Sequence, residues 1–180
     1  MHKNWLVINL NKNYFLKVGN KAFRCQIGAG GFENVAKKVE GDKTTPVGKW
    51  YLETLYYRPD RVPRPKFKKK NTLQINRITK NCGWCDDIRS LYYNKHININ
   101  NLSSQKINYE RLWREDSAYD IIIVISHNTK PTIKNKGSAI FIHCSFEEIR
   151  PTAGCIALKK RDLNYLIKNL EDNVCIEIKK

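Results

Sequence analysis

Thr152-Ala153-Gly154-Cys155-Ile156 places a cysteine directly after a glycine, twelve residues beyond His143, which follows an apolar run. Cysteine is a strong nucleophile only as a thiolate, and a neighbouring imidazole is the usual group that generates one near neutral pH. A glycine beside the nucleophile lets a carbonyl substrate approach closely and leaves backbone N–H groups to face a developing oxyanion. The segment therefore predicts a site for acyl transfer.

The second half of the chain predicts a β-rich core around this segment. Short apolar or alternating runs separated by turn residues are typical of strands. The expected strands cover residues 121–125, 139–142, 155–158 and 174–178. After Asp162, apolar side chains recur at the spacing of one helix face, which predicts a helix before the last strand. These side chains are Leu163, Leu166, Ile167 and Leu170.

The first half predicts further strands, over residues 5–9, 14–18, 23–27 and 50–57. Residues 58–120 are rich in Pro, Asn and aromatic residues and are expected to be irregular, with one strand near 73–78. A segment of this length usually carries a binding site or forms a lid. Since repeats and a clear boundary are lacking, we expect one domain over residues 1–180, mainly β with one or two helices.

The formal net charge of +16 over 180 residues raises the question of a polyanionic partner. The basic residues are mostly scattered through a sequence rich in Lys, Asn and Ile. The one dense run is Arg64-Pro65-Lys66-Phe67-Lys68-Lys69-Lys70, in a Pro-containing loop. We therefore expect no nucleic acid as partner, although such a charge favours adhesion to anionic surfaces or acidic substrates.

The N-terminal stretch has only a short apolar run, and no later segment is long enough to span a membrane. As the sequence stands, we expect a cytoplasmic protein, or a periplasmic one if a signal has been removed. The six cysteines are not spaced like a small secreted disulfide scaffold.

Cys82-Gly83-Trp84-Cys85 is a lone C-x-x-C segment. A redox motif of this spacing follows a strand and opens a helix, and a zinc site needs a second pair of ligands. Gly28-Ala29-Gly30-Gly31 is not followed by a helix pattern, so it does not predict a dinucleotide site. We expect neither a metal nor a cofactor. The residues expected instead to line a polar cleft are Trp84, Asp86, Tyr93 and Asn94.

His127 and His143 both stand where an apolar strand is expected to end. Neighbouring strands lie about 5 Å apart, so both imidazoles are expected to reach one cleft, with Asn128 beside them. A single histidine of this kind is more often a hydrogen-bonded structural residue, but two of them beside Gly154-Cys155 favour a functional site. Cys144 is expected to point to the other face of its strand. It joins Cys25 and Cys175 as an expected core thiol.

Three motifs together resemble the L,D-transpeptidase catalytic-domain (YkuD-type) family. They are Glu40-Gly41-Asp42-x-x-Thr45-Pro46-x-Gly48-x-Trp50, the strand-end His143, and Thr152-x-Gly154-Cys155-Ile156-x-Leu158. The resemblance runs from about Cys25 to the C-terminus, and the cysteine motif is its most specific part. Further segments, among them Gly83-Trp84-Cys85-Asp86-Asp87 and His127-Asn128, are similar to a compact single-domain branch of the family.

The resemblance implies two mixed β-sheets with an active-site cleft at their strand ends, and chemistry on peptidoglycan stem peptides. Cys155 would attack the carbonyl of residue three of a tetrapeptide stem and expel the terminal D-alanine. His143 would act as the base and then protonate the leaving amine. Backbone N–H groups around Gly154 and Cys155 would hold the oxyanion. Thr152, in the same motif, is a further candidate for the site.

Two positions depart from the family pattern. Ala153 stands where the family commonly has His or Lys, and Ala157 stands where it commonly has an arginine, a natural partner for a substrate carboxylate. Arg114 and then Arg58 are the candidates to replace that arginine. The connection from His143 to Cys155 is also shorter than in common members, which predicts a more open cleft.

The leading interpretation is a cysteine L,D-peptidase. Transfer of the acyl group to an amine gives L,D-transpeptidase cross-linking of the cell wall, and transfer to water gives L,D-carboxypeptidase activity on a soluble muropeptide during recycling. The residues do not separate the two. The alternative from another class is a non-catalytic basic module that binds an anionic glycan or nucleic acid.

Overall fold

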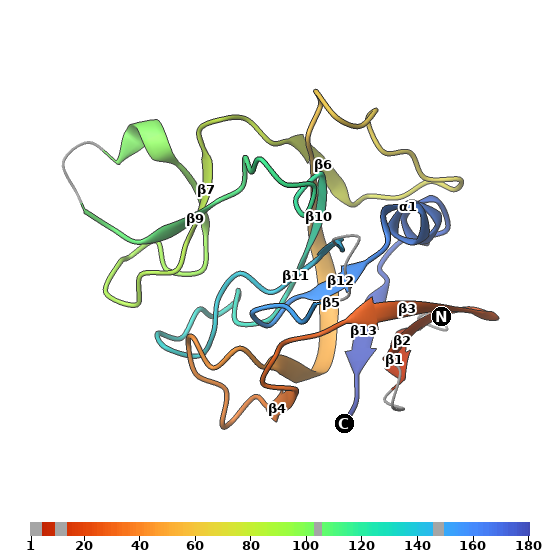
Figure 1. Cartoon of the computed structure of the whole chain (residues 1–180), viewed down its shortest axis with the longest axis horizontal. Helices are drawn as coiled ribbons and strands as arrows, with labels where there is room; N and C mark the ends of the chain where they lie inside the picture. The colour runs from red at the N-terminus through yellow and green to blue at the C-terminus, as the bar shows by residue number, and fades with distance from the viewer. Residues whose placement is uncertain (1–4, 10–13, 103–105, 146–149) are drawn as a thin grey trace.

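The computed structural model describes residues 5–9, 14–102, 106–145 and 150–180 (Figure 1). Within these residues the chain forms thirteen strands, one short 3-10 helix and one α-helix, so the prediction of a mainly β fold is confirmed. The main sheet contains β1 (Trp5–Asn9), β2 (Phe15–Val18), β3 (Lys21–Gln26), β4 (Phe32–Asn34), β5 (Thr45–Tyr57), β6 (Gln74–Arg77), β10 (Ile121–Ile125), β11 (Phe141–Cys144), β12 (Ile156–Leu158) and β13 (Cys175–Ile178).

The main sheet closes on itself because β5 is long enough to pair with a different strand along each half. Its first half pairs with β13, where Gly48 lies opposite Ile178, and its second half pairs with β10, where Tyr57 lies opposite Ile121. From β10 the order runs through β11, β12, β3, β2 and β1 back to β13. The pairs β11–β12 and β1–β13 are parallel and the others in this ring are antiparallel. One part of the ring contains β1, β2 and β13, and the other contains β10, β11 and β12. Joined by β3 and β5, these two parts are the two mixed sheets that the resemblance implied.

The central strands of this ring are buried on both faces. Alternate residues of β10, Ile121, Ile123 and Ile125, enter the main core, whereas Ile122 and Val124 enter a second core on the opposite face. Burial on both sides explains why β10 is a continuous apolar run rather than an alternation. The helix α1 (Lys160–Lys168) packs its apolar face into the main core. The second core lies under a small sheet, which Figure 1 shows on the side away from α1.

The small sheet corrects the expectation that residues 58–120 are irregular apart from one strand. The expected strand is present as β6, but the region also contains β7 (Cys82–Cys85), β8 (His96–Asn98) and β9 (Tyr109–Arg111), paired in the order β8-β7-β9. The 3-10 helix η1 (Ile99–Asn101) follows β8. Strands of three or four residues are too short to produce a detectable hydrophobic period. The C-x-x-C segment forms β7 and so does not open a helix.

The strand boundaries near the cysteine motif also differ from the prediction. β11 begins two residues later than expected and continues through Cys144, so His143 lies inside the strand. β12 begins at Ile156, so Cys155 lies on the loop directly before it. Cys25 and Cys144 belong to the main core and Cys175 is buried, as predicted. In the described part of the chain, no helix is both long and apolar enough to cross a membrane.

Candidate active site

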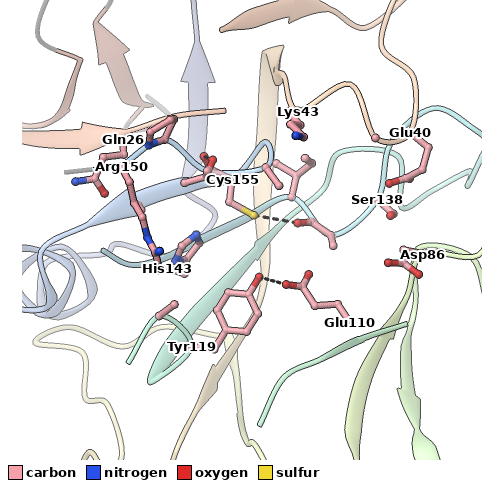
Figure 2. Close-up of a pocket in the computed structure, with 18 of the residues that line it drawn as sticks. Gln26, Glu40, Lys43, Asp86, Glu110, Tyr119, Ser138, His143, Arg150 and Cys155 are labelled. Carbon is pink, nitrogen blue, oxygen red and sulfur yellow. Dashed lines mark hydrogen bonds between the residues drawn. The ribbon is translucent and has the colours of Figure 1, made fainter. Parts of the chain in front are cut away.

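Cys155 and His143 share one cavity because their strands run parallel side by side. In this pairing His143 lies opposite Ala157, two residues after Cys155. Ile142 and Cys144 of β11 enter the main core, so His143 points to the opposite face, where Cys155 packs in the second core. Both line a cavity of about 650 Å³, with exposed fractions of 5% for His143 and 7% for Cys155 (Figure 2).

The tautomer of His143 follows from one backbone contact. Its Nδ1 lies 2.9 Å from the carbonyl oxygen of Cys144, which can only accept a hydrogen bond. Nδ1 therefore carries the proton and Nε2 keeps its lone pair in the neutral ring. Burial lowers the pKa of His143 to about 4. The Tyr119 ring and the imidazole pack in a T-shaped arrangement, with 5.3 Å between their centroids.

The Cys155 thiol is protonated in the resting site. Its Sγ donates to the carbonyl oxygen of Ala139 at 3.1 Å and accepts from the backbone N–H of Phe141 at 3.3 Å. Burial raises the pKa of Cys155 to about 12, and the nearby charge of Glu110 acts in the same direction. A neutral thiol therefore faces a neutral imidazole, rather than a thiolate facing an imidazolium.

The loop before Cys155 has a backbone shape that requires glycine. Gly154 has a φ of +136°, and a Cβ there would lie 2.9 Å from the carbonyl oxygen of Thr44. The Thr152 hydroxyl accepts from the N–H of Gly154 at 3.1 Å and donates to the carbonyl oxygen of Cys155 at 2.6 Å. Thr152 therefore closes a tight turn around the nucleophile.

The Thr45-Pro46 segment supports this loop through hydrogen bonds of the Thr45 hydroxyl. The Thr45 hydroxyl donates to the carbonyl oxygen of Gly154 at 2.8 Å and accepts from the N–H of Gly28 at 2.9 Å. Asp42 shapes the same turn by accepting from the N–H and the hydroxyl of Thr44, each at 2.8 Å, and from the Lys38 ammonium. Burial alone would raise the pKa of Asp42, but these hydrogen bonds outweigh it and lower the pKa to about 2.

Three carboxylates gather on one side of the cavity, whose lining also includes Lys38 and Lys43. Glu40, Asp86 and Glu110 line it, and Figure 2 shows all three on the same side of Cys155. The Tyr119 hydroxyl donates to Glu110 at 2.6 Å. Burial raises the pKa of both Glu110 and Asp86. Oδ1 of Asp86 is buried without a hydrogen-bond partner among the described residues.

The side next to His143 is basic. Nε and Nη2 of Arg114 donate to the two carboxylate oxygens of Asp116 at 2.9 and 2.6 Å. Arg150 lines the cavity, and its side chain extends towards His143 in Figure 2. The Arg114 guanidinium lowers the pKa of Asp116, and the charge of Arg150 contributes in the same direction. Arg114 and Arg150 are therefore both close enough to Asp116 for their charges to act on its carboxylate.

The structure brings together most, but not all, of the predicted site residues. Those that line the cavity or form its nucleophile loop are Cys155, His143, Gly154, Thr152, Arg114 and Asp86. Sequence reasoning did not assign several other lining residues to the site, although Glu40 stands in the motif that ends at Trp50. They include Lys38, Glu40, Glu110, Tyr119, Ser138 and Arg150.

The prediction that His127 shares the cleft with His143 is wrong. β10 and β11 are antiparallel, so the end of β10 meets the start of β11 and the two histidines lie at opposite ends of the pair. His127 is buried, its Nε2 lies 2.9 Å from the carbonyl oxygen of Lys136, and its ring packs edge-on against Trp50. Asn128 uses its amide to donate to Ile133 and Gly137, which places it in a structural loop.

Arg58, Trp84 and Tyr93 lie outside the residues that line the cavity. The Arg58 guanidinium stacks 3.6 Å from the Trp113 ring, binds Asp60 and donates to the carbonyl oxygen of Arg114 at 2.6 Å. It is therefore not a partner for a substrate carboxylate. The Trp84 ring donates to Asn94, and the Tyr93 hydroxyl donates to Glu40. Tyr93 therefore holds a residue that lines the cavity without lining it itself.

A β fold that holds a cysteine and a histidine in one cavity, beside a glycine-dependent loop, defines the class of cysteine-dependent acyl-transfer enzymes. The family model of the L,D-transpeptidase catalytic domain matches residues 3–178. The chain therefore belongs to the L,D-transpeptidase catalytic-domain family, whose members act on peptidoglycan stem peptides. No curated protein sequence matches it.

Proposed function

We propose that this protein is an L,D-peptidase that forms an acyl-enzyme at Cys155 on a tetrapeptide stem, with release of the terminal D-alanine. The observation that supports this most is the shared cavity of Cys155 and His143, in which the contact with Cys144 leaves Nε2 of His143 as the only basic ring nitrogen. A cysteine nucleophile and an oriented imidazole are the groups that acyl transfer requires.

The first step moves a proton as the sulfur attacks. The thiol turns away from Ala139, to which it donates at rest, and gives its proton to Nε2 of His143. The pKa of Cys155 is raised and that of His143 is lowered, so the ion pair is not the resting state. The proton therefore transfers as Sγ bonds to the substrate carbonyl carbon. The imidazolium then protonates the amine of D-alanine as the C–N bond breaks.

The developing oxyanion needs a donor close to Sγ. The N–H of Gly154 already donates to the Thr152 hydroxyl, so it is not the donor of choice. We assign this role to the N–H of Cys155 itself, which the Thr152 turn orients by binding the carbonyl oxygen of the same residue. The assignment narrows the sequence expectation, which included both N–H groups.

The charges of the cavity match a stem peptide placed across it. The acidic side formed by Glu40, Asp86 and Glu110 suits an ammonium group on the acyl-donor residue. A volume of about 650 Å³ is in the range of sites that enclose one small ligand. We therefore favour one stem end at a time and water as the acyl acceptor, which corresponds to an L,D-carboxypeptidase of soluble muropeptides in the cytoplasm. An amine acceptor would instead correspond to cell-wall cross-linking in the periplasm.

The test is the mass of the products formed from a purified disaccharide-tetrapeptide. Loss of one alanine indicates hydrolysis, and a cross-linked dimer or an exchanged terminal amino acid indicates transfer to an amine. An unchanged substrate contradicts the proposal and favours the non-catalytic binding module. Cys155→Ala is the control, since it removes the nucleophile and leaves the cavity walls in place.

A further inference from the structure

We propose that Arg150, with Arg114 beside it, binds the free carboxylate of the terminal D-alanine and restricts cleavage to stems that end one residue after the scissile bond. The inference rests on the proposed function and deepens it. It also replaces the sequence expectation, in which Arg114 or Arg58 took this role alone.

The position of His143 tells which side of the cavity receives the leaving group. The imidazole must reach the leaving nitrogen to protonate it, so the residue after the scissile bond lies on the His143 side of Cys155. In Figure 2 Arg150 and His143 lie on one side of Cys155, and Asp86 and Glu110 lie on the other. The basic side of the cavity is therefore the leaving-group side.

The small residue at 157 leaves room for Arg150. Ala157 lies opposite His143 in the parallel pairing of β11 and β12, is 2% exposed and lines the cavity. A methyl group there supplies neither charge nor bulk. The guanidinium at this end comes instead from residue 150, in the connection between the two strands, and extends towards His143.

Arg114 alone is poorly placed to bind a further carboxylate. Asp116 accepts two of its N–H groups, and Glu110 lies 3.7 Å from Nη1, so acidic side chains already compensate its charge. Arg150 adds a second guanidinium at the same edge of the cavity, and its charge is felt at Asp116. A guanidinium carries five N–H donors, so protein and substrate carboxylates can share the donors at this edge in charge-assisted hydrogen bonds.

The consequence is a preference for a free terminal carboxylate. A stem whose last residue ends in a carboxamide keeps the scissile bond but loses the ionic contact. Loss of one hydrogen bond to a charged group corresponds to about a 10- to 100-fold loss of kcat/KM. The effect belongs to substrate recognition, so the two substrates will differ even though the chemistry is identical.

The experiment measures D-alanine or D-alaninamide release from a disaccharide-tetrapeptide with a free or an amidated C-terminus. Wild-type protein should prefer the free acid by about 10- to 100-fold in kcat/KM. Arg150→Ala should lower the acid-to-amide ratio of kcat/KM towards one, and Arg150→Lys should recover part of the preference. Arg24→Ala, an exposed arginine of β3 outside the cavity lining, is the matched control and should keep the full preference.

Equal cleavage of both substrates by the wild type, or an equal loss on both in Arg150→Ala, would overturn the inference and leave the proposed function intact. A specificity ratio is not changed by a purely structural defect, which lowers both rates together. Cleavage of neither substrate by the wild type contradicts the proposed function itself, and the inference falls with it.

Discussion

The Thr45 hydroxyl donates a hydrogen bond to the carbonyl oxygen of Gly154 at 2.8 Å, across 109 residues of sequence. The same hydroxyl accepts from Gly28, which packs so closely that a Cβ there would lie 3.0 Å from the Gly154 Cα. Thr45 is fully buried. The Thr-Pro turn is therefore the support on which the nucleophile loop rests, rather than part of the reacting surface.

Replacement of this hydroxyl should disturb both stability and activity. Thr45→Val keeps the side-chain shape but leaves a buried N–H and a buried carbonyl without partners, which costs about 1–3 kcal/mol. We expect a lower free energy of unfolding and a lower kcat, because the loop that carries Cys155 loses its position. Thr45→Ser retains the hydroxyl and should stay close to the wild type. Urea unfolding and the rate of D-alanine release check both; equal behaviour of the two variants would contradict this role.

The backbone of Gly154 predicts a large effect for a single methyl group. Gly154→Ala meets both a φ of +136° and a contact of 2.9 Å with Thr44, so the loop must move. Gly19 also has a positive φ, of +56°, but has nothing within 4 Å of the added Cβ. Gly19→Ala should therefore cost only about 1–2 kcal/mol, the usual cost of a left-handed residue. Thermal unfolding should rank Gly154→Ala clearly below Gly19→Ala, with loss of activity in the former alone.

The resting protonation state predicts which thiol an alkylating reagent reaches first. The pKa of Cys155 is raised to about 12 by burial. Burial also acts on Cys82, but hydrogen bonds from His96 and Thr79 outweigh it and lower the pKa to about 7. Because the thiolate is the reactive form, iodoacetamide at pH 8 should label Cys82 before Cys155. Peptide mass mapping measures the order.

A Cys82→Ser variant then isolates the pH dependence of Cys155. In this variant the alkylation rate of Cys155 should keep rising between pH 7 and pH 9, without a plateau, because the pKa of the thiol lies above this range. A plateau near neutral pH would mean that Cys155 and His143 form an ion pair at rest, contrary to the hydrogen bonds described above.

The buried histidines predict a loss of stability in mild acid. Burial lowers the pKa of His127 to about 4, below the value of about 6.5 in an unfolded chain. The unfolded state therefore binds more protons between these values, so the free energy of unfolding falls as the pH drops from 6.5 to 4. His143 shifts in the same direction.

Comparison with a variant measures how much His127 contributes to the pH dependence of the free energy of unfolding. Asp86 and Glu110 have raised pKa values and oppose the trend, so the wild-type curve alone is a sum. His127→Gln removes one titrating group and should reduce the slope by up to about 1.4 kcal/mol per pH unit. Urea midpoints at pH 7, 6 and 5 measure it. Parallel curves for variant and wild type would show that His127 does not titrate in this window.

The core of the fold and the nucleophile were predictable because their signals are local. The run Ile121–Ile125 is long enough to indicate a buried strand, and the Gly154-Cys155 pair carries its chemistry in adjacent residues. The Thr-Pro turn was recognised as a motif, but its role as a support depends on a contact 109 residues away, which no local pattern contains.

The incorrect or missing parts depend on tertiary arrangement. Whether His127 joins His143 is decided by the direction of two neighbouring strands, and alternation alone does not reveal that β10 and β11 are antiparallel. Arg114 was placed ahead of Arg58 from its position in the sequence, but their contacts were not predictable: Arg58 is held by Asp60 and Trp113, and only Arg114 lines the cavity. Tyr119, Glu110 and Arg150 come from short or irregular segments and meet only in the folded chain.

The most direct test of the central claim is the rate of D-alanine release from a disaccharide-tetrapeptide by the wild type and by Cys155→Ala. In the proposed mechanism Sγ of Cys155 is the protein atom that forms a covalent bond to the substrate. Removing it should therefore abolish release, while the thermal unfolding of the protein stays similar. Release by the wild type with none from Cys155→Ala is the predicted result. Release by Cys155→Ala at the wild-type rate would contradict the assignment of Cys155 as the nucleophile.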